Sequence, residues 1–371
     1  MDTPVASQVE VLLMSMELSN TEYRLRFSNQ RREREVTVPA RDVEKLKHAI
    51  RVAKEKLGLN EGCRVVSCYE AGRDGFWLHR CLEQAGVENL VVDSASIEVN
   101  RRKRRAKTDR LDAKKLLAML IRHTICAEQG MWKIVRVPTE EQEDERRRHR
   151  EHERLKKELT AHMARIRSLL TLHGIAVKRM DPNVETYRDW AGRPLPAGIK
   201  MELTREFERV ELTTRQLHDL GKHRERCVKA PETQGDQATA KLMKVKAIGL
   251  ETASVLGYEF FGYRKFKNRR QVGALAGLTG TPYESGSLRR EQGISKAGNP
   301  RVRHKMVEAA WLWIRFQPES ALTKWFFANY GPDSHRKRRV GVVALARKIL
   351  VALWKYVEFD EVPQGAVLKA A

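Results

Sequence analysis

The sequence has few cysteines, and they do not occur at the spacings that cysteine chemistry requires. Its 371 residues contain five of them, with no Cys-x-x-Cys pair and no histidine-linked spacing of the kind that binds zinc. An odd number of scattered cysteines argues against a disulfide framework and against a zinc site. Reduced thiols in a cytoplasmic protein are the expectation. The five are Cys63, Cys68, Cys81, Cys126 and Cys227.

A long uninterrupted apolar run is also missing. The most apolar late segment, 340–354, is interrupted by Arg347 and Lys348, so we expect no membrane span and no membrane partner. Asp2 and Glu10 lie near the first residue, and no apolar run follows them, which argues against a secretory signal.

Acidic residues are scarce relative to basic ones. The chain has 71 Lys and Arg against 48 Asp and Glu, a formal net charge of +23. Such a charge favours a polyanionic partner, with nucleic acid ahead of any acidic small molecule. A merely soluble Lys/Arg-rich protein is the alternative. The basic clusters are at 101–107, 146–150, 264–270 and 336–339.

The first part of the chain, 1–138, alternates between strand and helix patterns. Three period-two or apolar segments come first, and helical and strand patterns then alternate. This order is that of a ribonuclease-H-like α/β fold. The expected strands are 9–18, 23–27, 33–38, 64–69 and 89–93, and the expected helices are 42–57, 75–85 and 109–121.

The remainder reads as mainly helical. Residues 139–228 begin almost wholly polar and then place apolar residues such as Leu155 and Leu170 at helical spacing, which predicts a long coiled-coil helix. An intramolecular hairpin and a dimerisation arm are equally compatible with this narrow seam. Residues 229–237 resemble a linker, and 238–371 holds most of the aromatics and is expected to have its own core. Within it, 246–253 resembles a helix-hairpin-helix element, whose backbone amides bind phosphate.

Two carboxylates follow the most basic run of the chain. Asp109 and Asp112 are three residues apart and share a helix face, and acids beside a polyanion-binding run would repel the ligand unless a cation stood between them. Glu70 and Glu17 end two of the expected strands and complete a set of four hard oxygen donors. Such donors hold Mg²⁺ or Mn²⁺ for phosphodiester chemistry. The basic run, expected to bind nucleic acid, is Arg101, Arg102, Lys103, Arg104, Arg105 and Lys107.

A second polar, basic stretch lies in the last part of the chain. Ser285, Ser287 and Ser295 lie between glycines that would let a ligand approach the backbone closely. From the residues alone, a DNA-contacting loop whose serines only hydrogen-bond phosphates is favoured over a serine nucleophile. The basic residues expected to bind nucleic acid here are Arg289, Arg290, Lys296, Arg301 and Arg303.

In order and separation, these segments resemble the bridge-RNA-guided transposases of the insertion-sequence family called IS-one-ten, relatives of the Piv DNA invertase. The likeness runs over nearly the whole chain, and although no single segment is decisive, the set is specific. The matching segments are Tyr69-Glu70-Ala71-Gly72, residues 107–113, Val137-Pro138, Ile248-Gly249 with Thr252-Ala253, residues 266–279, Ser285-Gly286 and residues 293–299.

The resemblance implies a RuvC-like domain with a DEDD acid set, a coiled-coil section and a carboxy-terminal serine transposase domain. It implies that Glu70, Asp109 and Asp112 hold Mg²⁺ and that Ser285 is the nucleophile, with Ser287 and Ser295 as the less favoured serines. It further implies donor and target DNA, a noncoding bridge RNA as guide, covalent serine–DNA intermediates, and a homo-oligomer, a dimer or tetramer.

One position departs from that family's pattern. The first acid of the set is normally Asp, whereas this chain has Glu17, whose extra methylene moves the carboxylate by ~1.5 Å. Two other functions stay open, and Glu17 supports the second of them. One is a RuvC-like metal-dependent nuclease that uses water and forms no covalent intermediate. The other is a catalytically inactive nucleic-acid-binding relative.

Overall fold

The structure is a computed structural model that describes residues 10–72, 75–97, 109–128, 130–285, 288–331 and 334–369, with side chains at 109–112, 283–285 and 288–291 not described. Contacts divide the chain into two units, Met1–Val137 and Pro138–Ala371. The first contains a mixed sheet with helices and the second is largely helical, as the sequence predicts at this coarse level.

A five-stranded mixed sheet forms the first unit, in the order β3-β2-β1-β4-β5. The first three strands pair antiparallel, whereas β1 pairs parallel with β4, and β4 parallel with β5. The central strand is therefore β1. The elements are β1 Val11–Leu18, β2 Glu22–Ser28, β3 Glu33–Pro39, α1 Val43–Leu57, β4 Arg64–Glu70, α2 Trp77–Gln84, β5 Glu88–Val92 and α3 Asp109–Thr124.

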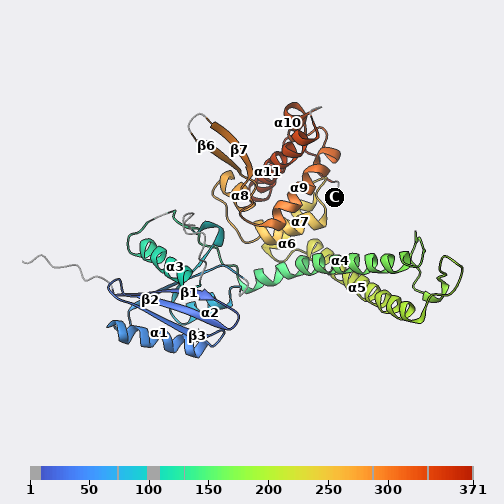
Figure 1. The fold of residues 1–371 in the computed structure, drawn as a ribbon. Helices are drawn as coiled ribbons and strands as arrows, with labels where there is room; N and C mark the ends of the chain where they lie inside the picture. The colour runs from blue at the N-terminus through green and yellow to red at the C-terminus, as the bar shows by residue number, and fades with distance from the viewer. Residues whose placement is uncertain are drawn as a thin grey trace, which may run out of the picture. The chain divides into compact units, whose positions relative to one another are not determined.

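Helices cover both faces of this sheet, and Figure 1 shows α1 on one side and α3 on the other. On β1, Leu12, Met14 and Met16 pack with α1 and α2, whereas Val11 and Leu13 pack with α3. Successive side chains of a strand point to opposite faces. The α3 face of the central strand therefore also carries its polar residues at 15 and 17.

Two long helices, α4 (Glu140–Thr171) and α5 (Ala197–Lys229), form an antiparallel hairpin at the start of the second unit (Figure 1). The hydrogen bonds His162–Glu206 (2.7 Å) and Arg165–Glu202 (2.6 Å) run in opposite directions along the two helices. A capping box at Thr139 and Gln142 begins α4. The structure confirms the intramolecular hairpin. Its apolar seam contains Ile166, Leu169, Leu170, Tyr187, Leu195, Leu203 and Phe207.

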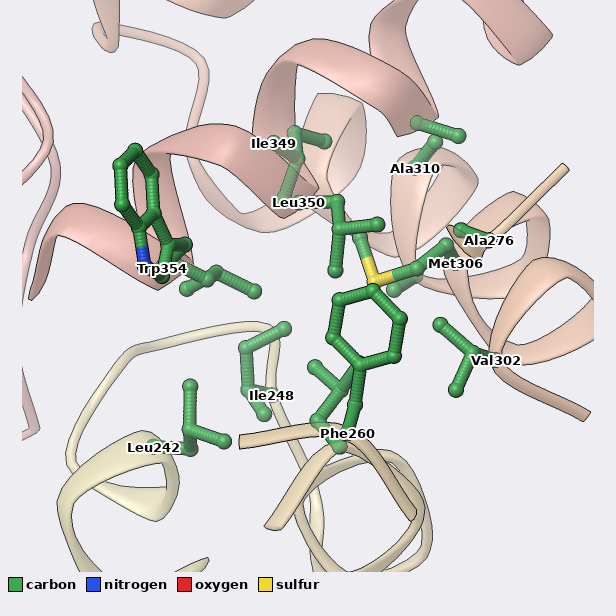
Figure 2. Close-up of a cluster of buried hydrophobic side chains, with 14 of the residues drawn as sticks. Leu242, Ile248, Phe260, Ala276, Val302, Met306, Ala310, Ile349, Leu350 and Trp354 are labelled. Atoms are coloured by element: carbon green, nitrogen blue, oxygen red, sulfur yellow. The ribbon is translucent and has the colours of Figure 1, made fainter. Parts of the chain in front are cut away.

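Helices and one hairpin of strands make up the rest of the second unit. Figure 2 shows its core, in which Phe260, Met306 and Leu350 come from three different helical segments. Among the described residues, no helix is long and apolar enough to cross a membrane. The elements are α6 Gln234–Met243, α7 Leu250–Leu256, the π-helical turn η4 Gly257–Phe261, α8 Arg269–Leu275, β6 Gly280–Ser285, β7 Leu288–Ile294, α9 Pro300–Phe316, α10 Ala321–Tyr330 and α11 His335–Phe359.

The linker predicted at 229–237 is shorter in the structure, where residues 230–233 alone separate α5 from α6. Helix α6 begins inside it, with Thr233 and Asp236 forming a capping box, and Gly235 and Asp236 are buried. The segment reads as a linker because Gly, Pro and Asp are typical of loops. Here Gly235 is needed for packing, since a methyl group at that position would lie 2.6 Å from the Tyr258 ring.

Candidate active site

The carboxyl ends of β1 and β4 bring two of the predicted acids to one edge of the sheet. The parallel register pairs Met16 with Tyr69, and Glu17 and Glu70 are the next residues on their strands. Val66 and Cys68 of β4 pack on the α3 face, so alternation puts Glu70 on that face, as it does Glu17. Glu17 is half-buried and Glu70 is exposed. Two carboxylates from neighbouring strands thus share one edge and one face.

Helix α3 meets the sheet close to this edge. The Ser15 hydroxyl on β1, fully buried, donates a hydrogen bond to the Ala113 carbonyl at 2.7 Å. Asp109 is the first residue of α3, and Asp112 immediately precedes Ala113. The start of this helix is therefore held beside the end of β1. The side chains of Asp109 and Asp112 lie outside the described part of the structure.

Metal binding by the four acids stays a prediction. Among the described side chains, no cluster of three or more His, Cys, Asp or Glu residues could hold a metal ion. Of the four predicted acids, the described side chains include only Glu17 and Glu70. Four carboxylates are the hard oxygen donors that Mg²⁺ and Mn²⁺ prefer, so the residue types fit such an ion. The basic run Arg101, Arg102, Lys103, Arg104, Arg105 and Lys107 lies outside the described residues.

Ser285 is the last residue of β6, at the turn of a two-stranded antiparallel hairpin. It pairs with Leu288, the first residue of β7, and Ser287 falls in the part of the turn that is not described. Arg289 and Arg290 follow on β7, and their side chains are likewise not described. The sequence predicted a loop here and not a hairpin, because its glycines and serines obscure the alternation typical of a strand.

The other predicted nucleic-acid contacts lie at the base of that hairpin and at the start of α9. Lys296 is exposed in a left-handed conformation, with φ of 55°. Arg301 forms an ion pair with Glu153 of α4 at 3.1 Å, and Arg303 Nη1 donates to the carbonyls of Lys296 (2.9 Å) and Ala276 (3.3 Å). The last two arginines therefore have contacts within the fold, and their role toward DNA stays a prediction.

A buried carboxylate in η4 was not found from the sequence. The side chain of Glu259, 2 % exposed, accepts hydrogen bonds from Arg150 Nε at 2.6 Å and Nη2 at 2.9 Å, and its Oε1 lies 3.1 Å from His149 Nε2. Asn299, which caps α9, donates to its other oxygen at 3.3 Å. Burial alone would raise the pKa of Glu259, but the hydrogen bonds from His149 and Arg150 outweigh burial and lower it.

This network joins three elements of the second unit. His149 and Arg150 belong to the polar first half of α4, and the sequence gives no sign of what these residues contact. Asn299 lies at the end of the loop that follows the β6–β7 hairpin. The one available sequence signal is Glu259 itself, a lone acid within the aromatic run 258–261. A charged residue in such a run is buried only when it is paired.

Known proteins resemble both the second unit and most of the chain. The family described as "Transposase IS116/IS110/IS902 family" matches residues 239–324, a segment that includes the β6–β7 hairpin. A putative transposase, y4rJ, of Sinorhizobium fredii is 43% identical over 313 residues, 81% of this chain and 78% of the relative. A probable family 20 transposase of Pseudomonas aeruginosa is 28% identical over 238 residues, 62% of this chain and 67% of the relative.

A shorter match covers 121 residues of the transposase for insertion sequence element IS1328 of Yersinia enterocolitica. It is 28% identical and spans 32% of this chain and 35% of that protein.

Proposed function

The chain belongs to the IS116/IS110/IS902 family of transposases. On this basis we propose that it cuts and rejoins DNA with Ser285 as nucleophile and with an RNA as guide. The observation that carries the proposal is the shared edge of β1 and β4, where Glu17 and Glu70 meet the start of α3 with Asp109 and Asp112. The strand order β3-β2-β1-β4-β5, with its parallel β1–β4–β5 half, supports the ribonuclease-H-like, RuvC-like assignment.

The four acids would hold Mg²⁺ or Mn²⁺, which when bound would stabilise negative charge on the phosphate oxygens. Glu70 and Glu17 would provide ligands from the two strands, and Asp109 and Asp112 from the helix. The exposure of Glu70 leaves this edge open to a DNA strand. Family members normally have Asp at the first position, and the longer Glu17 side chain can be accommodated by a change of rotamer.

Ser285 would attack phosphorus with its hydroxyl oxygen. A Ser–O–P bond forms, the bond from phosphorus to one DNA oxygen breaks, and the serine proton ends on that departing oxygen as a DNA hydroxyl. In the second step a hydroxyl of the other DNA attacks the phosphoserine ester, restores the P–O bond and returns a proton to Ser285. The number of phosphodiester bonds is unchanged, so no external energy source is needed.

Guide RNA and self-association complete the proposal. The resemblance to bridge-RNA-guided relatives supports a noncoding RNA that pairs with donor and target DNA, and the net charge of +23 supports binding of two polyanions. Action as a dimer or tetramer is proposed on the same resemblance. The test is sequencing of RNA that copurifies with the protein, together with its mass by light scattering with and without that RNA.

The nucleophile is tested with three matched variants, Ser285→Ala, Ser287→Ala and Ser295→Ala. We expect Ser285→Ala to reduce strand exchange by about 10³-fold or more while DNA binding persists, because an alanine cannot form the ester. Ser287→Ala should recombine as wild type does, and Ser295→Ala should still form the covalent adduct because it keeps the Ser285 hydroxyl. Labelled DNA should become covalently attached to wild type on a denaturing gel and not to Ser285→Ala. Cut DNA without any adduct would instead indicate a nuclease that uses water.

A further inference from the structure

Three basic residues surround the turn between α8 and β6, residues 276–279. Arg303 reaches it from α9 and donates to the Ala276 carbonyl, and the Lys296 amide donates to the Gly277 carbonyl at 3.2 Å. Arg347 reaches it from α11, a helix that packs on α8. In the sequence, Arg347 interrupts the apolar segment 340–354.

The side chain of Arg347 lies in a groove that a glycine makes possible. A methyl group at Gly273 of α8 would lie 3.2 Å from Arg347 Nε and 3.5 Å from Thr279 Cγ2. The first distance is shorter than an ordinary van der Waals contact, so a larger residue would push the guanidinium away. Gly273 is buried and Arg347 is half-buried. The Arg347 side chain therefore lies against Gly273 of α8, close to Thr279.

Within the described part of the chain, no carboxylate pairs with Arg347, Arg303 or Lys296, and Arg347 has no hydrogen-bond partner there. Two nearby cations do have partners, since Arg301 pairs with Glu153 at 3.1 Å and the Lys348 Nζ lies 4.3 Å from the centre of the Trp325 ring. Partial burial of an unpaired cation is unfavourable, and a guanidinium suits a phosphate through its two parallel N–H groups. Among the described side chains, this group therefore has no anionic partner.

Two hydroxyl groups lie beside these cations, that of Thr279 on the turn and that of Ser295 directly after β7. The Ser295 amide donates to the Thr279 carbonyl at 2.8 Å. Thr279 Oγ1 donates to Ser295 Oγ at 3.4 Å. Among the described residues nothing accepts the Ser295 hydroxyl hydrogen, so it can be donated to a ligand. Both residues are half-buried. Arginine with hydroxyl donors is a common combination at DNA phosphates.

We propose that Arg347, Lys296, Arg303 and the Thr279–Ser295 hydroxyl pair bind a phosphodiester of the DNA strand on which the enzyme acts. The inference rests on the proposed function and adds a residue to it. Ser285 lies five residues along β6 from Gly280, which at ~3.4 Å per residue is roughly 17 Å from the base of the hairpin. Arg347 therefore holds a different phosphate from the one Ser285 attacks.

The test measures DNA affinity against salt concentration with a duplex of arbitrary sequence. Each phosphate contact contributes about 0.9 to the slope of log K against log salt. Arg347→Gln should reduce the slope by about that amount, and Arg347→Lys should keep it. Lys355→Gln is the control on the same helix, since it removes one charge whose partner is Glu361 at 2.6 Å, and its slope should equal that of wild type.

A folded Arg347→Gln protein with the wild-type slope would overturn the site. If that variant does not fold, the exposed Lys296→Gln substitution provides the same test, and an unchanged slope would again overturn it. The same salt titration is repeated with single-stranded RNA of equal length. If Arg347→Gln lowered the slope for RNA and not for DNA, the assignment to DNA would be contradicted.

The outcome is separable from that of the proposed function. The salt slope of DNA affinity reports the Arg347 site, whereas the covalent adduct on a denaturing gel reports Ser285 as the nucleophile. Ser285→Ala should keep the wild-type salt slope and lose the adduct. Recombination by Ser285→Ala would thus refute the nucleophile and leave the phosphate site standing.

Discussion

The hydroxyl of Ser15 and the carbonyl of Ala113 are 2.7 Å apart, although 98 residues separate them in the sequence. One lies on the central strand two residues before Glu17, and the other lies in α3 one residue after Asp112. The contact is fully buried on the strand side. It joins the two segments that carry three of the four acids proposed to act together.

Replacing Ser15 by alanine tests this connection. We expect the free energy of unfolding to fall by about 1 kcal/mol, the usual contribution of one intramolecular hydrogen bond, with a parallel loss of recombination activity as α3 loses its fixed position. Denaturant unfolding and a recombination assay measure the two effects. Ser168→Ala, at an exposed position of α4, should change neither quantity. Full activity of Ser15→Ala would mean that the hydrogen bond is not needed to position α3.

Removal of the Glu70 carboxylate should act on the reaction and not on the fold. Glu70 is exposed at the end of β4, so Glu70→Gln should leave the melting temperature unchanged and lower the recombination rate by about 100-fold, corresponding to ~3 kcal/mol of transition-state stabilisation. A chelator should abolish the wild-type reaction, and added Mg²⁺ or Mn²⁺ should restore it.

The matched control for Glu70 is Glu88→Gln on the neighbouring strand β5. Glu88 pairs with Arg64 at 2.6 Å, and both side chains are about half exposed. An exposed pair of this kind contributes ~1 kcal/mol or less, so the variant should retain activity. Recombination that continues in the presence of chelator would remove the metal from the proposal.

Glu17 can be shortened to the residue that the family normally has. Glu17→Asp should keep recombination within about tenfold of wild type, since one methylene moves the carboxylate by only ~1.5 Å. Glu17→Ala should lose activity as Glu70→Gln does. A fully active Glu17→Ala protein would show that the remaining three acids are sufficient.

Acid should weaken the second unit through Glu259. Burial opposes the charged form of Glu259, but hydrogen bonds from His149 and Arg150 outweigh it and hold the pKa well below its ordinary value of 4.5. A group with a lowered pKa stabilises the fold above its ordinary value, and that stabilisation is lost as pH falls below it. We expect the melting temperature to drop as the pH is lowered below 4.5.

Glu259→Gln should flatten that pH dependence and reduce the free energy of unfolding at neutral pH by roughly 3 kcal/mol, because Arg150 loses its charged partner. Calorimetry over a pH series measures both effects. Glu158→Gln alters an exposed pair with Arg154 at 3.6 Å and should follow the wild-type curve. Parallel curves for wild type and Glu259→Gln would contradict the assignment.

The first unit could be predicted closely because its strands are regular. Alternation at Tyr23–Phe27 and helical spacing at Val43, Leu46 and Ile50 are local signals, and the structure confirms the corresponding strand and helix. The positions of Glu17 and Glu70 at the ends of their strands could be predicted from the same local patterns. The meeting of Ser15 with Ala113 could not be predicted, since a serine inside a strand carries no sign of a partner so far away in the chain.

The second unit was harder to predict, for two physical reasons. Gly235 and Asp236 have loop-forming preferences that tertiary packing overrides, so a buried helix was taken for a linker. Arg347 and Glu259 lie within apolar or aromatic segments, where a sequence shows a charge but not its surroundings. Whether the charge is paired or lacks a partner depends on helices from elsewhere in the chain.

The antiparallel pairing of α4 with α5 makes the length of this hairpin adjustable. Each contact joins positions whose numbers sum to nearly the same value, as in 162 with 206 and 165 with 202. Deleting seven residues from α4 between Arg150 and His162, and seven from α5 between Glu206 and Arg224, removes about two turns from each helix and keeps the remaining seam in phase. Relatives or engineered variants can therefore differ in reach by whole heptads, while the ion pairs around Glu259 that anchor α4 are preserved.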